Sequence, residues 1–241
     1  MIFDFHARLS PGLLGALDEA GIERAAVCAG GLVDLDRLSA QIDDGGRSEA
    51  RADNEGVRRA CEASGGRLVP FFFADPCRDA DAYAAAASRF RGLEISPAVH
   101  GFRLDEPGVD ALAETAAVTG HPVYVVCLGR PGTRAVDLAA LAGRHPAVTF
   151  VSGHCGHTGL DASGLNVLAG VPNTCVEISG CYTAVARLAV ARLGAARVLF
   201  GTEHPLQHPS VEVAKLRHLG LPPADLALVA SGNALRLLGE S

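Results

Sequence analysis

Polar side chains recur in this sequence at points where short apolar runs end. The first run, residues 1–9, carries His6 and Arg8, which are two residues apart and therefore point to the same face of a strand. Polar groups that converge from the ends of parallel strands are how an α/β barrel builds an active site. This polar pair on an otherwise apolar strand therefore marks a candidate active site.

Further polar side chains follow the later apolar runs, and these are Arg103, Asp105, Cys127, His154, His157, Glu203 and His204. Each has a structural explanation when taken singly. Arg103 and Asp105 could form a structural ion pair, and Glu203 could cap the next helix. Taken together, His6, His154 and Glu203 would converge on one barrel mouth, and this convergence predicts a functional pocket.

The elements that must position these groups alternate between strand and helix. Apolar runs predict strands over 1–9, 22–29, 67–74, 99–105, 122–128, 147–152, 174–178 and 197–200. Helical spacing and turn residues predict helices over 11–20, 53–64, 79–90, 109–119, 137–144, 184–193, 211–219 and 224–238. This alternation over 241 residues predicts one (β/α)8 barrel domain spanning 1–241, somewhat distorted and without a linker. A doubly wound open sheet competes, but no GxGxxG follows the first strand.

Residues 30–52 form a polar, acidic, glycine-containing stretch after the second predicted strand. Loops of this length in compact domains are often lids or binding loops, so we expect this segment to cover the site. A solvated surface excursion that contains a short helix explains the same composition. The sequence leaves both interpretations open.

Composition narrows the classes of function. The net charge of −6 and the scattered basic residues argue against a nucleic-acid surface. No apolar run approaches the ~20 residues that span a bilayer, and no signal peptide opens the chain, so we expect a soluble cytoplasmic protein. Seven cysteines without a CxxC pair argue against a disulfide framework or a zinc ribbon. We expect surface or turn positions, and no role, for five histidines: His100, His121, His145, His208 and His218.

Four stretches resemble the amidohydrolase superfamily, in its amidohydrolase-related group of small decarboxylases, lactonases and hydrolases: residues 4–8, 150–156, 200–205 and 232–238. The first resembles the family's His-x-His strand, the second its strand-six histidine, the third its Gly-Ser-Asp-x-Pro-like turn and the last its closing helix. The resemblance covers the whole chain. Arg8 replaces the family's second histidine, Cys127 its strand-five histidine and Glu203 its aspartate.

The resemblance implies a divalent metal, with zinc the first expectation and His6, Cys127, His154 and Glu203 as ligands. Thiolate, imidazole and carboxylate groups all bind zinc, and four ligands suit it. Arg8 argues the other way because its guanidinium cannot act as a ligand and stays charged. At ~4 Å and an effective dielectric constant of ~20 it would repel a divalent ion by about 8 kcal/mol. The sequence therefore leaves metal binding open.

Three functions stay open. The first is a metal-dependent hydrolase or decarboxylase of a small anionic substrate, with Glu203 as general base. Its substrate-binding residues would be Arg8, Arg103, His157 and His204. The second is a metal-free lactonase, lyase or isomerase that uses Glu203, Asp105 and His154 in acid-base chemistry. The third is a non-catalytic binding barrel, and a homodimer is expected from the resemblance alone.

Overall fold

Eight parallel strands form the centre of the molecule. The computed structural model describes residues 1–240, leaving aside the side chain at position 158. Within them the strands pair in sequence order: β1 (Phe3–Leu9), β2 (Arg24–Ala29), β3 (Leu68–Ala74), β4 (Gly92–Ile95), β5 (Val123–Val125), β6 (Phe150–Ser152), β7 (Thr174–Glu177) and β8 (Val198–Leu199). Backbone bonds from Phe5 N–H to Phe200 O (2.9 Å) and from Glu203 N–H to His6 O (2.8 Å) join β1 to the chain around the end of β8. The predicted (β/α)8 barrel is confirmed.

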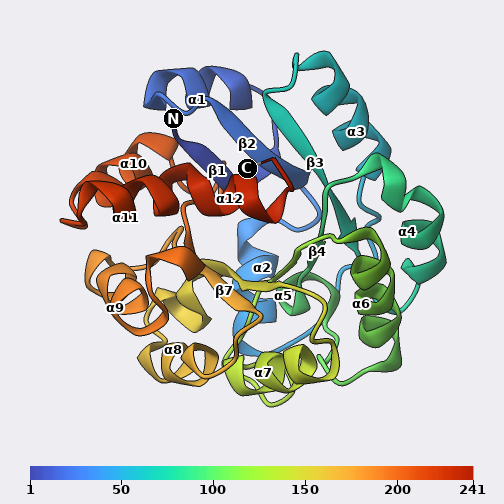
Figure 1. Ribbon diagram of the computed structural model, residues 1–241. Helices are drawn as coiled ribbons and strands as arrows, with labels where there is room; N and C mark the ends of the chain where they lie inside the picture. The colour runs from blue at the N-terminus through green and yellow to red at the C-terminus, as the bar shows by residue number, and fades with distance from the viewer. Residues whose placement is uncertain (241) are drawn as a thin grey trace.

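Helices surround the strands, as Figure 1 shows. In the described part of the chain they are α1 (Leu13–Ala20), α2 (Leu35–Asp43), α3 (Asn54–Ala63), α4 (Ala80–Ala86), α5 (Pro97–His100), α6 (Pro107–Thr119), α7 (Ala135–Arg144), α8 (Ala162–Ala169), α9 (Thr183–Leu193), α10 (Pro209–Arg217), α11 (Pro223–Ala227) and α12 (Asn233–Leu237). The loops after β2 and β4 contain the extra helices α2 and α5. None of the helices within residues 1–240 is long and apolar enough to cross a bilayer.

The fourth strand lies at Gly92–Ile95, so the prediction of a strand over 99–105 was wrong. Gly92 permits close packing in β4, because a Cβ there would lie 2.4 Å from the Phe71 ring. The predicted segment begins instead with helix α5, in which Pro97 occupies the first turn and Gly101 ends the helix in the left-handed region. Arg103 and Asp105 therefore follow α5 and do not stand at the end of a strand.

Two further differences concern helices. Helix α8 was not predicted from the sequence, and its first turn is capped by Asp161 through a 2.8 Å hydrogen bond from the Gly164 N–H. Gly164 and Asn166 are weak helix formers, which explains why the pattern was faint. The single helix predicted over 224–238 is divided into α11, a π-helical turn at Leu228–Gly232 and α12.

The interior of the barrel is unusually polar. Branched apolar side chains dominate the interior of most barrels of this fold. Here the strands and the segment after β8 bury a set of polar groups: Asp4, His6, Glu94, Ser152, Glu177 and Thr202. Buried charged groups must be paired or hydrogen-bonded to be tolerated. Hydrogen bonds hold Asp4 to Thr202, His6 to Glu94 and Glu177 to Tyr124, and these contacts surround the site.

Candidate active site

His154 and Glu203 form a contact at the carboxyl ends of β6 and β8. His154 Nε2 lies 3.3 Å from Glu203 Oε1, and both side chains are mostly buried. The two residues have backbone φ angles of 58° and 55°, which L-residues other than glycine rarely adopt. Such strain persists where the surrounding structure enforces it, and it concentrates at functional sites. The structure therefore brings together the two residues that the sequence proposed for proton transfer.

A buried relay orients the other side of the His154 ring. Nδ1 lies 2.9 Å from Ser179 Oγ, which donates to Glu177 Oε2 at 2.9 Å. Tyr124 OH donates to the same oxygen at 2.8 Å. The hydroxyl and the carboxylate beside Nδ1 fix the ring position, and Nε2 faces Glu203 and, at 3.5 Å, the Tyr124 hydroxyl. Sequence reasoning missed Glu177, Ser179 and Tyr124, although Glu177 is a lone carboxylate in an apolar run.

Arg8 is held by a second buried carboxylate. Its Nη2 donates to Glu94 Oε1 at 2.7 Å, and its Nη1 donates to Ala29 O at 3.1 Å and to Cys28 Sγ at 3.3 Å. The guanidinium carbon also lies 5.0 Å from the centre of the Phe73 ring. Burial alone would raise the pKa of Glu94, but Arg8 and His6 lower it, and the net shift is downward. Glu94 was also missed, and its signal was a single charge within Gly92-Leu93-Glu94-Ile95.

His6 lies between these two groups. Its Nε2 is 3.2 Å from Glu94 Oε2, and its ring stacks on Tyr124 at a centroid distance of 4.0 Å. The His154 ring meets it edge-on at 5.7 Å. Its Nδ1 is buried and has no hydrogen-bond partner among the described residues. His6 therefore links the Arg8 and Glu94 pair with the His154 and Glu203 pair.

Asp4 fixes the segment that carries Glu203. It accepts hydrogen bonds from Thr202 Oγ1 (2.5 Å) and from the Thr202 N–H (2.9 Å). Neither Asp4 nor Thr202 was predicted as a site residue. Burial raises the pKa of Asp4 to about 8, although the Thr202 and His6 hydrogen bonds oppose that rise. The backbone turn at Glu203 is thus tied directly to β1.

A pocket of about 500 Å³ opens above these residues. Arg8, His154 and Glu203 contribute polar groups to its wall, together with His157. The segment after β2, which was predicted to cover the site, contributes apolar side chains: Leu32, Val33, Leu35, Leu38 and Ile42. A concave apolar wall with a few converging polar groups is the usual form of a small-molecule site.

The structure places the other predicted residues differently. Arg103 and Asp105 pair with each other at 2.7 Å, are 52% and 57% exposed, and do not line this pocket. Cys127 lines the pocket but is buried, and burial raises the pKa of its thiol to about 12. His204 is half-buried and lies outside the lining, and burial lowers its pKa. His100 and His121, expected at the surface, are buried.

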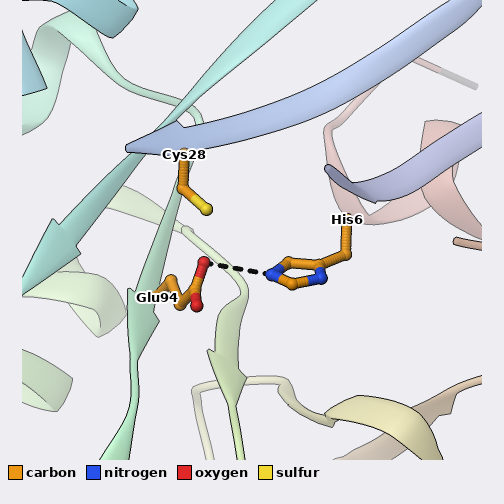
Figure 2. Close-up of side chains that lie close together, drawn as sticks. All are labelled: His6, Cys28 and Glu94. Carbon is orange, nitrogen blue, oxygen red and sulfur yellow. Dashed lines mark hydrogen bonds and ion pairs between the residues drawn. The ribbon is translucent and has the colours of Figure 1, made fainter. Parts of the chain in front are cut away.

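Three potential metal ligands lie together below the pocket. The ligand atoms of His6, Cys28 and Glu94 lie within 4.8 Å of one another (Figure 2), and the described residues contain no other such group. The predicted set of His6, Cys127, His154 and Glu203 does not form one. Each Glu94 oxygen already has a partner, and Arg8 also donates to Cys28. A divalent ion does not fit among these donors while the guanidinium stays in place.

The chain is similar in fold to solved decarboxylases. The 5-carboxyvanillate decarboxylase from Sphingomonas paucimobilis is 17% identical at a TM-score of 0.72, covering 97% of this chain and 84% of that one. The 2,6-dihydroxybenzoate decarboxylase from Rhizobium is 17% identical at 0.70, covering 99% and 98%. A 5-carboxyvanillate decarboxylase from Novosphingobium aromaticivorans DSM 12444, with bound manganese, is 16% identical at 0.74, covering 95% and 81%.

A family comparison supplies the classification. The family model described as Amidohydrolase matches residues 31–239. The match begins after β2, so His6 and Arg8 lie outside it. A search of the curated proteins found no match. Since the family match spans most of the chain, this protein belongs to the amidohydrolase family and is an enzyme of the hydrolase or lyase type.

Proposed function

We propose that this enzyme decarboxylates a small carboxylic acid with an apolar body, and that the His154–Glu203 pair supplies the proton. The observation that carries the proposal is the 3.3 Å contact between these two side chains in the wall of a pocket that Arg8 also lines. A proton donor and a fixed cation facing one cavity suit a reaction in which a carboxylate leaves and a proton takes its place.

Arg8 is the anchor for the substrate carboxylate. Its three hydrogen bonds, to Glu94, Ala29 and Cys28, use three of the five guanidinium N–H groups. The remaining N–H groups are available to an anionic ligand in the pocket. Charge-assisted hydrogen bonds from a guanidinium to a carboxylate are among the stronger polar contacts in proteins. Glu94 keeps the guanidinium fixed before the substrate arrives, which lowers the entropic cost of binding.

The proton passes to the carbon that carries the carboxylate. His154 Nε2, protonated and in contact with Glu203, donates to that carbon, and the C–C bond to the carboxylate then breaks. A pair of π electrons of the substrate ring forms the new C–H bond, the electron pair of the broken C–C bond restores the ring, and CO2 leaves. Glu203 takes up a proton from the bulk solvent, supplied by hydronium or buffer acid, and passes it to His154, which restores the pair. One proton is consumed for each CO2 released.

The substrate class is proposed from the pocket and from the neighbours. Carbon protonation is easiest in an electron-rich ring, and two of the neighbouring structures are named for the hydroxylated aromatic acids 5-carboxyvanillate and 2,6-dihydroxybenzoate. A volume of about 500 Å³ lies within the usual range for pockets that hold such molecules. We therefore propose a hydroxylated aromatic acid, with the apolar residues of the segment after β2 against its ring.

The cofactor expected from the resemblance is a divalent metal ion. Bound manganese in neighbouring structures supports a divalent metal in related decarboxylases. For this chain, zinc stays a prediction, and the arrangement around Arg8 does not favour a divalent ion. None of the steps above uses one.

The test is CO2 release from a panel of hydroxylated benzoates. Glu203→Gln removes the carboxylate with little change in size and should lower kcat by about 10²- to 10⁴-fold. Glu114→Gln makes the same chemical change on the exposed surface of α6 and should leave the rate unchanged. An unchanged rate in Glu203→Gln would contradict the proposal that the His154–Glu203 pair supplies the proton.

The family classification favours one second candidate, a hydrolase. The same His154–Glu203 pair could remove a proton from water that attacks an ester, a lactone or an amide. Turnover of such substrates, together with no CO2 release from any acid of the panel, would select the hydrolase. Glu203→Gln should then abolish hydrolysis.

A further inference from the structure

We propose that the Arg8 guanidinium is a built-in replacement for a divalent cation, and that a metal site formed by His6, Cys28 and Glu94 lies latent beneath it. The proposal goes beyond the reaction proposed above and does not depend on it, because its readout is metal binding. It predicts that the natural protein binds no divalent ion at these residues, and that a neutral side chain at position 8 creates the site.

Geometry gives the first argument. One imidazole, one thiol and one carboxylate place their ligand atoms within 4.8 Å of one another, and all three side chains are buried. They come from β1, β2 and β4, so the barrel positions them without any loop (Figure 2). Nitrogen, sulfur and oxygen donors at this spacing suit zinc or cobalt, whereas a thiolate is a poor partner for manganese.

The contacts of Arg8 give the second argument. The guanidinium touches two of the three donors, with Nη2 at 2.7 Å from Glu94 Oε1 and Nη1 at 3.3 Å from Cys28 Sγ. A positive group thus occupies the position from which a cation would bind both. It is held there by Ala29 O and by the face of the Phe73 ring. The guanidinium thus has four contacts that fix its position between the donors: Glu94, Cys28, Ala29 and Phe73.

Charge gives the third argument. In the natural protein the charges of the buried Arg8–Glu94 pair cancel. A divalent ion with a Cys28 thiolate would leave this buried group with one excess positive charge. Without the guanidinium, the same ion, thiolate and carboxylate would be neutral. Removing Arg8 therefore removes both the competitor and the excess charge.

Position 8 can also add a ligand. Residues 6 and 8 both lie in β1, and although its register shifts between Asp4 and Ala7, both side chains reach Glu94. Arg8→His would place a second imidazole beside His6 and complete a set of four donors, which is the number that zinc and cobalt prefer. Arg8→Gln removes the charge without adding a strong ligand, so it separates the effect of charge from the effect of the new imidazole.

The experiment is Co²⁺ and Zn²⁺ binding by equilibrium dialysis, with absorption spectroscopy of the cobalt form. Arg8→His should bind one ion per chain at least 100-fold more tightly than the natural protein, with a sulfur-to-cobalt charge-transfer band. Arg8→Gln should bind more tightly than the natural protein and less tightly than Arg8→His. Thermal melting without metal shows that each variant is folded, and Arg8→Gln keeps the test open if Arg8→His is not.

Matched controls locate the site. Cys28→Ser in the Arg8→His background should remove the charge-transfer band and return the affinity to the natural level. Arg59→His exchanges the same residues at a 62% exposed position on α3 and should bind no additional ion. The proposal is overturned if the natural protein binds one ion per chain as tightly as Arg8→His does. It is equally overturned if neither Arg8 variant gains affinity, or if Cys28→Ser leaves the gain intact.

Discussion

Changing Glu94 to Gln should destabilise the protein strongly, because it leaves the Arg8 guanidinium without its counter-charge. Glu94 is fully buried, Arg8 is 14% exposed, and their closest atoms are 2.7 Å apart. Removing one partner of a buried ion pair typically costs 3–5 kcal/mol. Because the pocket gives Arg8 some access to water and Gln keeps an oxygen acceptor, we expect the lower end, about 3 kcal/mol. In a chain of this length that loss corresponds to a fall in Tm of roughly 6–12 °C.

A double-mutant cycle measures the pair directly. Urea unfolding followed by circular dichroism gives the free energy of unfolding of the natural protein, of Glu94→Gln, of Arg8→Gln and of the double variant. The double variant has no buried charge to leave unpaired, so it should be more stable than Glu94→Gln alone. A loss under about 1 kcal/mol in Glu94→Gln, or a double variant less stable than that single variant, would refute the electrostatic reasoning.

The Arg8–Glu94 pair should also make the free energy of unfolding depend on pH in the acid range. The folded-state pKa of Glu94 is depressed, so its stabilisation is present above its unfolded value of 4.5 and is lost as the pH falls toward the folded value. Glu94→Gln should lack that part of the acid sensitivity. The measurement is the difference in unfolding free energy between the two proteins across the acid range.

Two further predictions concern other buried polar groups. Ser179→Ala removes the hydroxyl between His154 Nδ1 and Glu177 and should lower kcat by about 10-fold, less than Glu203→Gln, with KM little changed, because the serine orients the ring and does not touch the substrate; a loss as large as that of Glu203→Gln would contradict this ranking. The second group is His121, whose Nδ1 forms a 2.7 Å hydrogen bond with the Tyr83 hydroxyl. Burial, together with the positive charge of Arg91, lowers the pKa of His121 from 6.5 to about 4. Between pH 6.5 and 4 the His121 side chain is therefore protonated in the unfolded chain but not in the folded one. The free energy of unfolding should fall by about 2 kcal/mol as the pH drops from 6.5 to 4. Unfolding curves of His121→Gln should lack that decline, and an identical pH dependence in both proteins would contradict the assignment.

The sequence predicted the barrel well, because eight apolar runs separated by helical patterns have few other solutions. It also singled out His6, Arg8, His154 and Glu203 as polar residues at the ends of apolar runs, and the structure places His154 beside both His6 and Glu203. The prediction of strand four over 99–105 was wrong, because β4 lies at Gly92–Ile95. The strand was short, and its packing against Phe71 is a tertiary effect that a local pattern does not contain.

The partners of the predicted residues were harder to find for a physical reason. Glu94, Glu177 and Tyr124 sit inside strands, where a period-two pattern does not show whether a lone polar residue faces the barrel axis or the helices. Their role follows from contacts made across the barrel. Glu94 pairs with Arg8, and Glu177 accepts hydrogen bonds from Tyr124 OH and from the His154 N–H. Such pairings join residues up to 86 positions apart, and no spacing rule predicts them.

The guanidinium at position 8 accounts for the buried carboxylate beside it. A metal ion brings its own charge and is neutralised by its ligands, whereas a guanidinium in the same place needs a permanent carboxylate. Glu94 meets that need, and the depressed pKa keeps it ionised. A guanidinium cannot generate hydroxide from bound water as a metal does, so the reaction that we propose assigns proton transfer to His154 and Glu203. That division of tasks favours carbon protonation over attack by water, and it links the choice between decarboxylase and hydrolase to the residue at position 8.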